Sequence, residues 1–85
     1  MTLRKILEKI LGGSKNISFS EMRRLVEGFG FQPVRISGSH HIFRHPTVAE
    51  LVNLQDVRGQ AKPYQVRQFL KLVEEYNLAL EDDEP

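Results

Sequence analysis

The spacing of apolar residues in the first third of the chain predicts two amphipathic helices. Over residues 3–11 an apolar residue recurs every three or four positions, and charged residues occupy the other face. A Gly-Gly pair at residues 12–13 ends this helix. The second helix begins at Ser18, which is placed to form a capping box with Glu21, and it ends before Gly30.

In the next part of the chain the pattern changes to a period of two, which predicts strands. Residues 34–37 and 40–45 form a hairpin around a Gly-Ser turn, and a third, short strand covers residues 51–54. A polar loop follows over residues 56–62, and Pro63 begins the last helix. This order predicts an α+β fold, α-α-β-β-β-α, in which a three-stranded antiparallel sheet packs on helices through one face.

The 85 residues are long enough for one small domain with an extension at each end. We expect residues 1–16 to form an N-terminal amphipathic helix with a glycine linker, residues 17–80 the domain proper, and residues 81–85 an acidic, disordered tail. Lys and Arg number 12, Asp and Glu number 11, and four of these acids lie in the tail. Residues 1–80 therefore carry a net charge of +5, which suits a polyanionic partner.

The composition excludes several kinds of protein and site. The chain has no cysteine, which rules out disulfides, thiolate zinc sites and cysteine nucleophiles and is compatible with a reducing compartment. No apolar run reaches the roughly 20 residues that cross a bilayer. Charged residues interrupt the first apolar stretch, so we expect a cytoplasmic protein without a secretory signal or a membrane partner.

The hairpin carries the residues best suited to catalysis. Its turn reads Gly38-Ser39-His40-His41, and His45 lies further along the return strand. Imidazole transfers protons near neutral pH, so these residues suit acid–base catalysis, although histidines on strands also serve as ordinary packing residues. A metal site fits less well, because His41 and His45 are roughly 13 Å apart along a strand and the hairpin contains no carboxylate or cysteine.

Three segments of the chain share the pattern of a known family. They are the capped helix from Ser18 to Phe31, the hairpin from Arg35 to Phe43 with its Gly-Ser-x-His motif, and the Gly- and Lys-containing loop at residues 59–62. Together they resemble the HicA toxins of bacterial HicA–HicB toxin–antitoxin pairs, also called the YcfA-like family, over residues 17–78. The resemblance implies a fold similar to double-stranded-RNA-binding domains. It also implies metal-independent cleavage of mRNA without a cofactor, and neutralisation by a HicB-type antitoxin.

The resemblance also implies roles for individual residues. His41 matches the motif histidine of the family, which implies that it acts as general acid or base on the ribose 2′-OH or on the leaving 5′-oxygen. His40 occupies the variable position of the motif. We expect RNA to be contacted by the turn residues Gly38, Ser39 and His40 and, from charge and placement rather than from the family, by Arg35, Arg44 and Lys62.

One segment departs from the family pattern. Many relatives carry a histidine on the third strand, in a Val-Pro-x-His-like segment, whereas residues 51–56 of this chain contain none. A second proton-transfer group is therefore missing unless His40 or His45 replaces it.

Two other functions fit the same sequence. The same fold without catalysis would be an RNA-binding module that recognises phosphates and helical shape. Alternatively, the apolar helix at residues 3–11 would dock on a protein partner, which would make the chain a protein-interaction domain. The simpler role of this helix is to pack against the sheet of its own chain.

Overall fold

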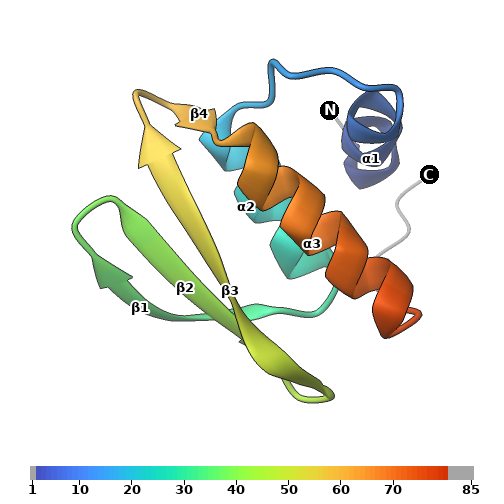
Figure 1. Cartoon of the computed structure of the whole chain (residues 1–85), viewed down its shortest axis with the longest axis vertical. Coiled ribbons are helices and arrows are strands. Elements are labelled where there is room, and N and C mark those ends of the chain that lie inside the picture. Colours follow the sequence, from blue (N-terminus) through green and yellow to red (C-terminus); the bar gives the residue numbers. More distant parts are fainter. Residues whose placement is uncertain (1, 81–85) are drawn as a thin grey trace.

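The computed structural model describes residues 2–80. Three helices lie on one side of an antiparallel sheet, as Figure 1 shows, which confirms the predicted α+β fold. Within the described residues, no helix combines the length and the apolar character that crossing a membrane requires. In chain order the elements are α1 (Leu3–Leu11), α2 (Phe19–Gly28), β1 (Gln32–Ser37), β2 (His40–His45), β3 (Val48–Val57), β4 (Gln60–Ala61) and α3 (Pro63–Glu75).

The three helices begin where the sequence predicted them, and α1 and α2 also end there. At the start of α2 the backbone N–H of Glu21 donates to Ser18 Oγ at 3.1 Å, and the backbone N–H of Ser18 donates to Glu21 Oε1 at 2.9 Å, which completes the capping box. Gly30 follows the helix with a φ of +97°, a conformation that costs glycine little. Lys9 of α1 also reaches Glu21, with its Nζ atom 3.2 Å from Oε1.

The sheet differs from the prediction in its last part. Its order is β1-β2-β3-β4, and β3 covers Val48–Val57 rather than residues 51–54 only. The predicted polar loop contains a tight turn at residues 58–59 and the short strand β4, which pairs with the end of β3. The pattern did not reveal the first half of β3 because the register with β2 shifts between Phe43 and His45, which interrupts the alternation of buried and exposed residues.

Helix α1 belongs to the same hydrophobic core as the rest of the domain. Leu3, Ile6 and Ile10 are buried in that core. Gly28 of α2 allows the close approach, because a Cβ atom at this position would lie 2.6 Å from Leu3 Cδ1. The helix therefore packs within its own chain, although its main contact is with α2 rather than with the sheet.

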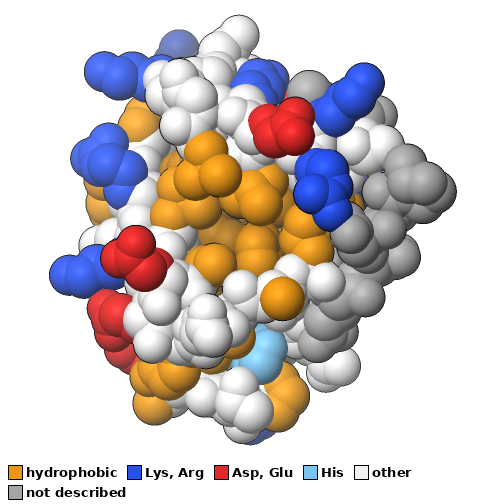
Figure 2. Space-filling model, turned by 90° about the vertical axis from the view of Figure 1, so that its right-hand side faces the viewer, with side chains coloured by type: hydrophobic (Ala, Val, Ile, Leu, Met, Phe, Trp, Pro, Cys, Tyr) orange, Lys and Arg blue, Asp and Glu red, His pale blue; other side chains and the backbone are white. Residues whose placement is uncertain are grey.

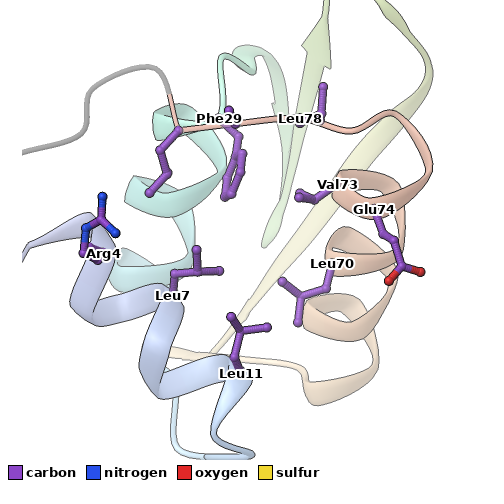
Figure 3. A pocket seen from close by; sticks show the side chains of 10 residues that line it. Arg4, Leu7, Leu11, Phe29, Leu70, Val73, Glu74 and Leu78 are labelled. Atoms are coloured by element: carbon purple, nitrogen blue, oxygen red, sulfur yellow. The ribbon is translucent and has the colours of Figure 1, made fainter.

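A groove of about 510 Å³ runs between α1 and α3. Leu7 and Leu11 of α1 and Leu70 and Val73 of α3 line it, as Figure 3 shows. Figure 2 looks at the side of the molecule that carries these helices and shows hydrophobic side chains gathered in a hollow. The Leu11 side chain is 66% exposed, so α1 does not bury all of its apolar residues.

Candidate active site

The hairpin of β1 and β2 places the turn of the Gly-Ser-His-His motif at one end of the sheet, at the left in Figure 1. Gly38 has a φ of +61°, and a Cβ atom there would meet nothing within 4 Å. The carbonyl of Ser39 accepts a hydrogen bond from the backbone N–H of Asp56 at 2.9 Å, and its Oγ accepts one from Gln55 Nε2 at 3.4 Å. The turn is therefore accessible to a ligand and is anchored to β3.

The two adjacent histidines of the motif lie on opposite faces of the sheet, as the strand period predicts. His41 stands opposite Leu54, which is fully buried, so it points to the side of the sheet that carries the helices. His40 points to the other face, which no helix covers in the described part of the chain. His45 lies on the helix side, where its ring contacts Phe31 with centroids 5.0 Å apart.

The imidazole of His41 packs against Phe19, the first residue of α2. The two ring centroids are 4.5 Å apart and the planes are tilted by 52°. His41 is half-buried, and within residues 2–80 its ring nitrogens have no hydrogen-bond partner. The contact with Phe19 thus orients the ring while both nitrogens remain available to a ligand.

The other two histidines use ring nitrogens in contacts within the sheet. His40 Nδ1 lies 3.2 Å from Asn53 Oδ1 on the uncovered face. His45 Nδ1 lies 3.1 Å from the backbone N–H of Thr47, and since that N–H can only donate, Nδ1 carries the lone pair. Neither ring lies beside His41, and Leu54 occupies the third-strand position opposite it. The structure therefore brings no second histidine to this site.

The basic residues expected to contact phosphates separate into two groups. Arg35 stands opposite Ile42 on the uncovered face, and Arg35 and Arg44 line one shallow hollow of about 400 Å³. Lys62 is the N-cap residue of α3 and directly follows Ala61, which pairs with Asp56 of β3. The backbone N–H of Asp56 donates to the carbonyl of Ser39 in the turn. The structure thus gathers Gly38, Ser39, His41 and Lys62 at one end of the molecule and leaves Arg35, His40 and Arg44 on the opposite face.

One residue of this region, Phe19, was not identified from the sequence. Phe19 has the spacing of a core residue, and nothing near it in the chain indicates that its ring meets His41 of the hairpin. Only the tertiary contact between α2 and β2 shows that Phe19 belongs to this site.

Chemically, the site offers an imidazole, a hydroxyl and a cation. His41 can move a proton, Ser39 Oγ can donate to an anion, and Lys62 supplies positive charge, with Nζ 5.8 Å from the centre of the Tyr64 ring. Among residues 2–80, no three His, Asp or Glu side chains are placed to hold a metal ion together. The arrangement is suited to acid–base chemistry on a phosphate ester.

A comparison with protein families identifies the segment that carries this site. Residues 19–74, from the start of α2 to the last turn of α3, match the family described as the HicA toxin of bacterial toxin–antitoxin systems. No curated protein and no solved structure matches the chain. The matched segment covers more than half of the chain and includes the whole hairpin, whereas α1 lies outside it. The chain therefore belongs to the HicA family and is a toxin of a bacterial toxin–antitoxin pair.

Proposed function

We propose that this toxin is an endoribonuclease that cleaves mRNA without a metal ion, with His41 as the residue that transfers a proton in the cleavage step. The hairpin turn, the start of α2 and the start of α3 form the site of this reaction. In this view Gly38 admits the RNA backbone, Ser39 holds a phosphate oxygen, and Lys62 neutralises phosphate charge.

The availability of the His41 ring is the single observation that carries this proposal. Of the three histidines, His40 and His45 each have Nδ1 within hydrogen-bonding distance of a protein group, whereas no such contact involves His41 within residues 2–80. A proton-transfer group must reach its substrate with a free nitrogen lone pair or N–H. His41 meets this requirement and is also held on one side by Phe19.

RNA carries its own nucleophile, so the chemistry requires little from the protein. The ribose 2′-oxygen attacks the adjacent phosphorus, the new O2′–P bond forms, and the P–O5′ bond breaks. The products are a 2′,3′-cyclic phosphate and a free 5′-hydroxyl. One proton leaves the 2′-OH and one is gained by the 5′-oxygen; His41 performs one of these transfers, and water performs the other.

We further propose that a HicB-type antitoxin inhibits the toxin by covering His41 together with the cation at Lys62. The turn at Gly38 is open, so another protein can reach it. An inhibitor that carries acidic groups to this basic end of the molecule would displace RNA and block the imidazole at the same time.

The test compares RNA cleavage and bacterial growth for the wild type, His41→Ala and the neighbouring control His40→Ala. We expect His41→Ala to lower the cleavage rate by about 10²- to 10⁴-fold, the usual share of a general acid or base, and to relieve growth arrest. His40→Ala should retain most of the activity. Equal cleavage by wild type and His41→Ala would overturn the assignment, and activity that disappears on addition of EDTA would overturn the metal-free mechanism.

The same experiment addresses the alternative of an RNA-binding module. If no variant cleaves RNA but all bind it with a steep dependence on salt, the chain acts through binding alone. Arg35→Ala and Lys62→Ala then locate the bound RNA, because these two cations lie on opposite sides of the sheet. Loss of binding in Arg35→Ala alone would place the RNA on the uncovered face.

A further inference from the structure

The outer edge of β3 has backbone groups without a partner strand. In an antiparallel pair, alternate residues direct both N–H and C=O to the neighbouring strand, and the residues between them direct both groups away from it. The N–H of Asp56 bonds Ser39 at 2.9 Å on the β2 side, whereas the N–H of Gln55 bonds Gln65 Oε1 at 2.8 Å on the α3 side. By the same alternation Asn53, which stands opposite Ile42, directs its N–H and C=O groups away from β2. Leu51 lies beyond Val52, the last β3 residue that is paired before the register shift, and because the strand stays extended there we infer the same direction for its N–H and C=O.

No strand covers this part of the edge within residues 2–80. Strand β4 pairs with β3 only through Asp56 and Val57. The backbone groups of Asn53 and Leu51 instead face a groove of about 260 Å³ that β3 and α3 enclose. Phe69 and Leu72 of α3 form its apolar wall.

Side chains close both ends of this groove. At one end Gln65 takes the place of a strand by bonding the N–H of Gln55. At the other end the Tyr76 hydroxyl donates to Glu50 Oε1 at 2.6 Å and so ties the end of α3 to β3. Four residues of β3, residues 51–54, lie between these contacts, an open length of about 13 Å.

The groove is more acidic than the rest of the molecule. Glu50, Glu75 and Lys71 line it, a net charge of −1, whereas residues 1–80 carry +5. A nucleic acid backbone is repelled by this lining. An extended peptide with a basic residue instead matches both the backbone groups of the edge and the carboxylates at its end.

The opposite edge of the sheet is less suitable for such pairing. Strand β1 contains Pro33, which lacks an N–H, and its register shifts between Pro33 and Arg35. Proline and bulges are the usual means by which proteins protect an edge from other strands. The edge of β3 has no proline, and a helix beside it supplies apolar contacts.

We propose that the groove between β3 and α3 is a docking site for an extended segment of a partner protein, which adds a strand along Leu51–Asn53 and places a Lys or Arg side chain against Glu50 and Glu75. This site is distinct from the hairpin turn with His41, and the inference does not depend on the proposed nuclease activity. A partner protein bound in this groove would leave the hairpin turn and His41 uncovered.

The test is an NMR titration of the full chain with an acetylated and amidated hexapeptide, Lys-Val-Thr-Val-Thr-Val. We expect shifts and slower hydrogen exchange at the amides of Leu51 and Asn53. A peptide with Glu in place of Lys should bind about five-fold more weakly, the size expected of one exposed ion pair. A peptide with N-methylated backbone groups should not bind, since it cannot form the ladder.

Two protein variants complete the test. Glu75→Lys should weaken binding of the Lys peptide about five-fold, whereas Glu74→Lys, the same change in the groove between α1 and α3, should not. Leu51→Pro removes one N–H from the edge of β3 and should abolish peptide binding. If Leu51→Pro fails to fold, the effect of Glu75→Lys on peptide affinity serves as the test. The proposal is overturned if the peptide causes no shifts, or if it shifts only the amides of β1. It is also overturned if the amides of Leu51 and Asn53 shift on dilution without peptide, or on addition of an oligoribonucleotide in place of the peptide.

Discussion

The imidazole of His41 rests on the phenyl ring of Phe19 with centroids 4.5 Å apart, although 21 residues separate them in the chain. This contact joins the hairpin turn, which carries the family motif, to the capped start of α2. It fixes one face of the ring and leaves the nitrogens at the ring edge for a substrate. The orientation of the proposed catalytic group therefore depends on a core residue.

Replacing Phe19 should lower activity by misplacing His41. We expect Phe19→Leu to reduce the first-order rate of RNA cleavage by about 10- to 100-fold with little change in KM, because a small misplacement of a catalytic group is costly. Phe29→Leu is the matched control, since Phe29 is also buried but contacts Phe69. Equal losses in both variants would mean that Phe19 acts only through general stability.

Replacing His45 should affect stability and not catalysis. The ring accepts hydrogen bonds at Nδ1 from Thr47 and packs on Phe31, so His45→Ala loses both contacts. We expect a decrease of about 1–3 kcal/mol in the free energy of unfolding, measured by urea denaturation. Cleavage per folded molecule should stay at the wild-type rate. A loss comparable to that of His41→Ala would give His45 a role in the reaction.

Helix α1 should be required for folding even though it lies outside the segment that matches the family. Ile6 is fully buried against α2, so Ile6→Ala should cost about 2–5 kcal/mol. Leu11→Ala, on the same helix, should change the free energy of unfolding by less than about 0.5 kcal/mol, because Leu11 is 66% exposed. Urea unfolding of both variants measures the difference. If both variants changed the free energy of unfolding by a similar small amount, α1 would be an extension that the domain does not need for folding.

Stability should decrease in acid through Glu21. The hydrogen bond from the Ser18 backbone N–H, assisted by Lys9, holds the pKa of the Glu21 carboxyl below its usual value of 4.5. A lowered pKa in the folded state means that the unfolded chain binds more protons, so this contribution is present above pH 4.5 and is lost as the pH falls through the folded-state pKa.

Urea denaturation at a series of acidic pH values tests this origin. Glu21→Gln keeps a capping group but cannot titrate, so its free energy of unfolding should fall less steeply in acid than that of the wild type. Ser18→Ala should cost about 1 kcal/mol at neutral pH by removing the side-chain cap. Parallel pH curves for the wild type and Glu21→Gln would assign the acid sensitivity to other carboxyls.

Local patterns in the sequence were sufficient to predict the helices and the hairpin and to identify the family. The capping box of Ser18 and Glu21 and the glycine at position 38 act over four residues or fewer, so their geometry follows from the residues beside them. The alternation along β2 also placed His40 and His41 on opposite faces. These features depend on backbone geometry that any chain with these residues adopts.

Contacts between segments far apart in the chain determined the features that the sequence did not predict. The pattern could not show which face of the sheet the helices cover, and this choice puts His41 against Phe19 and leaves Arg35 and Arg44 on the other side. The full length of β3 depends on a register shift against β2, and the position of α1 depends on the room at Gly28. Side-chain packing between segments far apart in the chain determines these features, and periodicity within one segment carries no information about it.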